Sequence, residues 1–187
     1  MSRTDLRVLA IAGSLRKASF NRMVLEVAKG LAPAGMSIEI FDRLGDIPPY
    51  NEDVRSGDDP QAAVALADAV RAADAVLIAT PEYNYSIPGV LKNAIDWASR
   101  APEQPFKDKP LAIMGAAMGA LGTARAQYHL RQIFVFLEAN VLNRPEVFIG
   151  GAHTKFDKNG ALNDETAKDL ITQQLEALKV WTLRLRG

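Results

Sequence analysis

The sequence of 187 residues contains no cysteine. This absence excludes disulfide bonds, thiolate–zinc sites, iron–sulfur clusters and a cysteine nucleophile. Its two histidines, His129 and His153, lie far apart in the chain and have no second metal ligand at helix spacing. The sequence therefore predicts no metal site and no thiol chemistry.

The chain also lacks an excess of charge of either sign, because 22 Lys and Arg residues balance 22 Asp and Glu residues. A neutral chain is a poor nucleic-acid binder, and it lacks the acidity of a small electron carrier that docks by charge. We expect Asp68, Asp74 and Asp96 to be solvated charges near helix ends.

No apolar run approaches the roughly 18 residues of a membrane-spanning helix, and the N-terminal residues do not resemble a signal peptide. We therefore expect a cytoplasmic protein that binds neither membranes nor nucleic acids.

Several common site motifs are absent as well. The sequence has no Gly-x-Gly-x-x-Gly fingerprint and no Gly-Lys-Ser/Thr ending of a P-loop, which are the usual cradles for di- and triphosphates. It also has no Gly-x-Ser-x-Gly elbow, so an α/β-hydrolase triad has no obvious nucleophile.

What is present is a regular alternation of short apolar runs and longer helical patterns. The apolar runs predict strands at residues 6–12, 37–42, 75–80, 111–117 and 147–149. The helical patterns cover residues 19–34, 61–73, 90–99, 123–139 and 165–185. This alternation is typical of a parallel sheet that helices cover on both faces. We predict one domain over residues 1–187, with a flavodoxin-like, doubly wound, five-stranded parallel sheet in the order 2-1-3-4-5.

The loop after the first strand carries four hydrogen-bond donors directly before a predicted helix. After Gly13 come Ser14, Arg16, Ser19 and Asn21. Together with the helix N-terminus, such a set suits a terminal monophosphate. The alternative is that Ser19 or Asn21 only caps the helix and that Arg16 is a solvated guanidinium.

The loop after the third strand, residues 80–89, contains two tyrosines and two prolines. A stiff loop of this kind can lie along a planar heterocycle. The alternative is that Tyr83 and Tyr85 are turn or interface aromatics and that Pro88 and Gly89 start a helix. Strands one and three are neighbours in the predicted order, so both loops meet at the switch point where flavin mononucleotide (FMN) is expected.

Residues 13–21 and 81–97 resemble the bacterial NADPH-dependent FMN reductase family, most closely its chromate, quinone and ferric reductase branch. The resemblance continues through residues 118–122, 127–132 and 143–146, and the Pro-Glu-Tyr-Asn stretch is its most specific part. It implies FMN as cofactor and NADPH or NADH as reductant. The implied acceptors are quinones, azo compounds, ferric chelates or chromate.

The resemblance also implies which residues bind FMN. They are Gly13, Ser14, Leu15, Arg16, Ser19, Phe20 and Asn21 around the phosphate, and Pro81, Glu82, Tyr83, Asn84 and Ala117 around the ring and ribityl chain. Many relatives have serine where Ala117 stands, so here only the backbone would contribute. Because the flavin does the chemistry, no catalytic acid or base is expected. Arg100 is expected either to steer an anionic nucleotide or acceptor, or to be solvated.

We therefore predict ping-pong hydride transfer from NAD(P)H through FMN to a small acceptor. One alternative is a flavodoxin-type one-electron carrier with a protein partner, which the neutral charge disfavours. Another is a flavin-free regulatory binding module.

The predicted helix at 123–139 carries apolar residues almost all round, among them Leu130 and residues 133–137. A surface helix normally shows a single apolar stripe, so a second copy of the chain is expected to cover part of this one. We predict a homodimer, which can pair further into a homotetramer, with active sites near the subunit boundary. The alternative is that the extra apolar residues pack under the final helix of the same chain.

Overall fold

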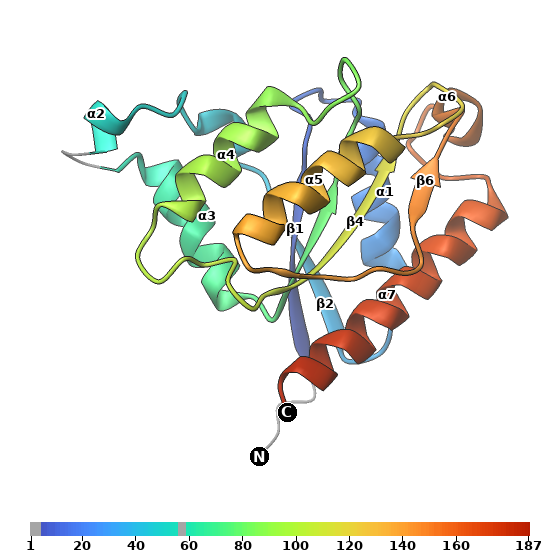
Figure 1. Cartoon of the computed structure of the whole chain (residues 1–187). Helices are drawn as coiled ribbons and strands as arrows, with labels where there is room; N and C mark the ends of the chain where they lie inside the picture. The colour runs from blue at the N-terminus through green and yellow to red at the C-terminus, as the bar shows by residue number, and fades with distance from the viewer. Residues whose placement is uncertain (1–4, 56–58) are drawn as a thin grey trace.

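The computed structural model describes residues 5–55 and 59–187, in which strands and helices alternate along the chain (Figure 1). The strands are β1 (Leu6–Ala12), β2 (Met36–Phe41), β3 (Ala75–Ala79), β4 (Pro110–Ala116), β5 (Asn140–Val141) and β6 (Val147–Ile149). The helices are α1 (Phe20–Gly30), α2 (Glu52–Arg55), α3 (Gln61–Ala72), α4 (Gly89–Ser99), α5 (Ala124–Phe136), α6 (Ala152–Lys155) and α7 (Glu165–Leu185), with a 3₁₀ turn, η1, at Leu44–Asp46.

All pairings in the sheet are parallel, and the strand order is β2-β1-β3-β4-β5. This confirms the predicted doubly wound sheet. The fifth position differs in one respect, because two short strands share it. Asn140 and Val141 pair with the start of β4, whereas the predicted strand at Val147–Ile149 pairs with its end. A two-residue strand is too short to give a periodic signal in the sequence.

The sheet separates two apolar cores. Alternate residues of a strand point to opposite faces, so Val8 and Ala10 contact the helices α1 and α7, whereas Leu9 and Ile11 contact α3, α4 and α5. The helices cover the two faces accordingly (Figure 1). Burial on both faces explains why the central strands have continuous apolar sequences.

Two helices are shorter than predicted. The helix α1 ends at Gly30 rather than at residue 34, because Pro33 disfavours helical backbone at the residue before it. The helix α5 ends at Phe136, and Glu138 follows with a φ of 54°, in the left-handed region that terminates helices.

Residues 5–55 and 59–187 contain neither a membrane-spanning helix nor a cluster of metal ligands. No helix in these ranges is both long and apolar enough to span a bilayer. The same residues hold no group of three or more His, Cys, Asp or Glu side chains that could bind a metal ion.

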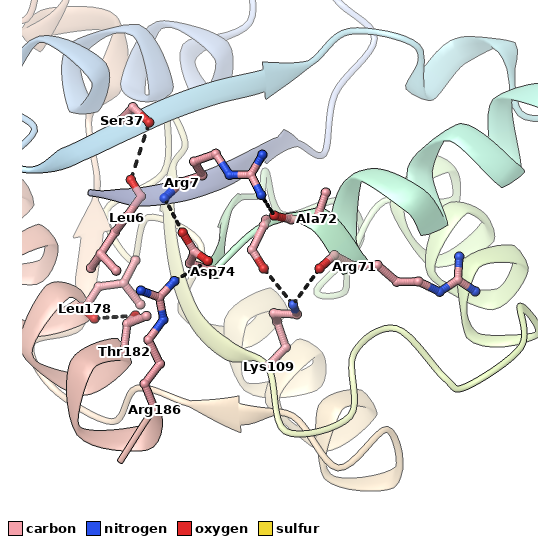
Figure 2. Close-up of polar contacts among 11 residues, drawn as sticks. Leu6, Arg7, Ser37, Arg71, Ala72, Asp74, Lys109, Leu178, Thr182 and Arg186 are labelled. Atoms are coloured by element: carbon pink, nitrogen blue, oxygen red, sulfur yellow. Dashed lines mark hydrogen bonds and ion pairs between the residues drawn. The ribbon is translucent and has the colours of Figure 1, made fainter. Parts of the chain in front are cut away.

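Asp74 lies between α3 and β3, where it joins three distant parts of the chain (Figure 2). Its carboxylate accepts a hydrogen bond from the backbone N–H of Arg7 at 2.7 Å and forms an ion pair with Arg186, beyond the end of α7. The side chain is only 17% exposed. The expectation of a solvated Asp74 is therefore wrong, because the pairing partners lie 67 or more positions away in sequence. Asp68 and Asp96 are more exposed and pair within their own helices.

Opposing effects set the pKa of Asp74. Burial alone would raise this pKa, but the bonds from Arg7 and Arg186 together lower it below its usual value. Beside it, the ammonium group of Lys109 donates to the carbonyl of Ala73 at 2.7 Å, and burial lowers the pKa of this lysine. Ionised Asp74 therefore stabilises the folded chain.

We predict that Asp74→Asn lowers the free energy of unfolding at pH 7 by about 1.5–3 kcal/mol, the range for hydrogen bonds to a charged group. Because the folded-state pKa is lowered, this contribution is present above the unfolded value of about 3.9 and is lost as pH falls through the folded value. Urea unfolding at pH 7 and at pH 3 measures the difference. Asp68→Asn, at an exposed ion pair, is the control and should change little. An equal loss at both pH values would contradict the prediction.

Candidate functional site

A cleft of about 320 Å³ opens where β1, β3 and β4 end. Because parallel strands end at the same edge of the sheet, the loops that follow them meet there. Its lining consists of Ser14, Arg16, Ser19, Phe20, Asn21, Pro81, Glu82, Tyr83, Ala116, Ala117, Met118 and Gly119. The structure therefore brings the predicted phosphate loop and the predicted ring loop together in one cleft.

The start of α1 forms one wall of the cleft. Ser19 precedes the helix in extended conformation and is 3% exposed, but its side chain does not cap the helix. The first turn contains no acidic residue. The first N–H groups of a helix have no partner within the helix, and they favour an anion. This end of α1 therefore suits a negatively charged ligand.

The phosphate loop contacts the ring loop through Ser14. Its hydroxyl oxygen lies 3.4 Å from the hydroxyl of Tyr83 and accepts a hydrogen bond of 3.4 Å from the backbone N–H of Arg16. The side chain of Arg16 is exposed at the mouth of the cleft. A guanidinium in this place can reach an anion held at the start of α1.

The ring loop is a tight two-residue hairpin. Tyr83 and Ser86 exchange both backbone hydrogen bonds, at 2.9 and 3.0 Å, and the two residues between them have positive φ angles of 49° (Asn84) and 67° (Tyr85). Asparagine adopts this conformation readily, whereas for tyrosine it costs about 1–3 kcal/mol. The sequence indicated a stiff loop but gave no signal of this turn, because its central pair, Asn84-Tyr85, lacks the usual glycine.

Contacts with α5 hold this hairpin in place. The carboxylate of Glu82 accepts hydrogen bonds from the backbone N–H groups of Arg125 (3.0 Å) and Ala126 (3.2 Å) and from the guanidinium of Arg125 (2.5 Å). That guanidinium lies 3.7 Å from the ring centroid of Tyr85, where a cation–π contact offsets part of the backbone strain. The side chain of Glu82 thus fastens the hairpin to α5.

The loop after β4 forms the remaining wall. Ala117 donates its N–H to Ile149 and accepts from Ala152 with its carbonyl, both at 3.0 Å. The backbone of Ala117 is therefore already paired, and what it adds to the cleft is its methyl surface. At Gly150, a side chain would collide with the carbonyl of Ala120. The turn after β6 can therefore approach this loop only because residue 150 is a glycine.

Some predicted residues lie outside the lining. A Cβ atom on Gly13 would lie 3.1 Å from Leu91 and 3.3 Å from Pro81, so this glycine allows the ring loop to pack on the end of β1. Leu15 lines a neighbouring hollow instead, and Asn84 occupies the tip of the hairpin.

The structure does not bring Arg100 to the cleft. It lies at the end of α4, with its guanidinium 6.0 Å from the ring centroid of Tyr50. The helix α4 begins at Gly89 beside the ring loop and extends 11 residues, about 16 Å, before Arg100.

Comparisons with known proteins agree in one family. A family model described as NADPH-dependent FMN reductase matches residues 6–154. An NAD(P)H-dependent FMN reductase of Pseudomonas aeruginosa is 59% identical over 183 residues and covers 98% of both chains. A quinone reductase of Escherichia coli K12 is 47% identical over 183 residues, with 97% of both chains covered.

A solved structure is similar over almost the whole chain. FerB, an NAD(P)H:acceptor oxidoreductase from Paracoccus denitrificans, is 34% identical with a TM-score of 0.86. The similarity covers 96% of this chain and 98% of that one.

Proposed function

The chain belongs to the NADPH-dependent FMN reductase family, and from this premise we propose that it is a flavoenzyme that passes hydride from NADPH or NADH through FMN to quinones. The observation that carries the proposal is the cleft at the ends of β1, β3 and β4. There an anion site at the start of α1 lies beside a rigid aromatic turn.

The cleft fits FMN in size and in chemistry. Its volume is in the range of small-molecule sites. Ser14, Arg16, Ser19 and the first N–H groups of α1 supply donors for one phosphate, and no glycine-rich diphosphate loop is present. Tyr83 and Met118 also belong to the lining, where their side chains can contact a planar ring. When bound, FMN supplies the hydride chemistry.

The protein's own contribution is binding and orientation. Within the described lining the only carboxylate is that of Glu82, which is paired with α5, and no histidine is present. We therefore propose no catalytic acid or base.

Two of the large exposed apolar side chains, those of Tyr83 and Met118, belong to the lining of the cleft. This apolar surface suits flat, apolar acceptors, which favours quinones and azo compounds over chromate and ferric chelates. An open mouth also suits ping-pong exchange, in which the reductant leaves before the acceptor enters. NADPH and NADH are cytoplasmic metabolites, so we propose the cytoplasm as the compartment.

The rival function is a one-electron carrier with the same fold and the same cofactor. The balanced charge of the chain argues against docking by electrostatic attraction. A carrier would also need a separate reductase, whereas the relatives compared above are named as reductases themselves.

The first experiment uses the purified protein with NADPH or NADH and a small benzoquinone. We expect a yellow protein that releases FMN on denaturation and oxidises the reductant in a quinone-dependent manner. A panel with ferricyanide, chromate and an azo dye then ranks the acceptors. Release of FAD, or a colourless protein that ignores added FMN, would overturn the proposal.

Arg16→Ala should weaken FMN binding roughly ten- to a hundredfold, because a charge-assisted hydrogen bond contributes about 1.5–3 kcal/mol. Turnover of the FMN-saturated variant should change little, since the phosphate end lies away from the ring. Fluorescence titration of the apoprotein measures the affinity. Lys17→Ala is the matched control, because this neighbouring cation is exposed and lies outside the lining of the cleft. Equal affinities of the Arg16 variant and the parent would show that Arg16 is only solvated.

We also propose a homodimer, with a homotetramer as the further form. In α5, Leu130 and Phe134 are buried in the core that includes residues of α3 and α4, whereas Val135 and Phe136 are 77% and 85% exposed. Large apolar side chains with this exposure favour coverage by a second copy.

Light scattering at low micromolar concentration tests the assembly. We expect at least twice the chain mass of 20.3 kDa for the parent, and dissociation for Phe136→Glu, because a charge at a dimer contact opposes burial. Val180→Glu, at an exposed apolar position on α7, serves as the control. A fully active particle of 20.3 kDa would contradict the proposed dimer.

A further inference from the structure

The side chain of Asn21 connects two walls of the cleft. It is 2% exposed, and its Nδ2 donates to the carbonyl of Ala116 at 2.9 Å. Its Oδ1 accepts from the N–H of the same Ala116, also at 2.9 Å. A single amide thereby joins the first turn of α1 to the last residue of β4, which lies 95 positions away in sequence.

The hydrogen bonds from Asn21 to Ala116 take the place of those that a neighbouring strand would make. Two residues before Ala116, Met114 accepts a hydrogen bond from the N–H of Thr80. Residues two apart in a strand direct their polar groups to the same side, so Ala116 also faces β3. But β3 ends at Ala79, and the backbone of the next residue, Thr80, bonds to Met114 and not to Ala116. Without Asn21, both polar groups of Ala116 would be buried and unpaired.

The two residues that this amide joins stand beside the two halves of the site. Next to Asn21 lie Ser19 and Phe20, and directly after Ala116 come Ala117 and Met118, all in the lining of the cleft. The sequence indicated that the side chain of Asn21 binds phosphate. In the structure this side chain bonds to Ala116, while its backbone N–H stays at the open end of α1.

We propose that Asn21 is a positioning residue, whose amide sets the spacing between the phosphate-binding and the ring-binding halves of the FMN site. The inference rests on the proposed function, because it assumes that FMN spans both halves. A fixed spacing lowers the ordering cost for a ligand that touches both halves, but it does nothing for a ligand that touches only one.

Asn21→Ala tests this with three ligands of the apoprotein. FMN spans both halves, riboflavin lacks the phosphate, and inorganic phosphate lacks the ring. We expect the dissociation constant of FMN to rise at least tenfold, while those of riboflavin and of phosphate, the latter measured by competition, stay within about twofold of the parent. Flavin fluorescence gives the affinities without any measurement of activity.

The other outcomes overturn the proposal. Weaker binding of phosphate alone would mean that Asn21 holds the phosphate directly. Weaker binding of riboflavin to the same degree as FMN would mean that the ring half has collapsed. A parent that binds no FMN overturns the proposed function and this inference together, whereas a parent and a variant with equal FMN affinity overturn this inference alone.

Asn93→Ala is the matched control. This half-buried amide on α4 makes the same kind of double contact, with Oδ1 accepting from Tyr50 at 2.7 Å and Nδ2 donating to Pro48 at 2.9 Å, outside the lining of the cleft. We expect a comparable loss in melting temperature and no change in FMN affinity. Equal weakening of FMN binding in both variants would assign the effect to general stability. Asn21→Ser, whose hydroxyl can still bond one group of Ala116, provides the same test if the alanine variant does not fold.

Discussion

Hydrogen bonding along β4 is the constraint on which the rest of the structure depends. This strand lacks a continuous partner on either side, because β3 ends at Ala79 and the fifth position of the sheet is interrupted between Val141 and Val147. A buried carbonyl or N–H group without a partner is strongly unfavourable. The chain meets this requirement with long polar side chains from the neighbouring helices.

The side chain of Asn21 serves the β3 side, and others serve the gap between β5 and β6. Gln174 of α7 donates to the carbonyls of Ile113 and Pro145, and Gln127 of α5 donates to that of Val147. Arg131 donates to the carbonyl of Leu142. Since Gln127 and Gln174 are buried, their bonds favour one register of the two helices against the sheet. The loop after β4 therefore has a defined position on both of its flanks.

The sequence predicts the layers of this fold well, because burial on two faces leaves a direct mark in the composition of each strand. It also indicates the two loops of the cleft, since their place follows from the ends of the strands. The partners of individual polar side chains could not be predicted in this way. Each of these partners lies far away in sequence. The hydrogen bonds join Glu82 to α5 over 43 positions, Asn21 to Ala116 over 95 and Asp74 to Arg7 over 67. Arg100 illustrates the same limit. It follows the ring loop closely in sequence, but α4 lies between them and places Arg100 one helix length away from that loop.

The cleft lies across the boundary between the two cores. The helix α1 belongs to the layer that includes α7, whereas the hairpin of the ring loop is fastened to α5 in the opposite layer. A molecule that fills the cleft consequently cross-links the layers and stabilises the fold in proportion to the logarithm of its free concentration. Resistance to proteolysis is thereby coupled to the supply of ligand. A shortage of ligand raises the population of the unfolded form that proteases cleave, and it also leaves the cleft empty.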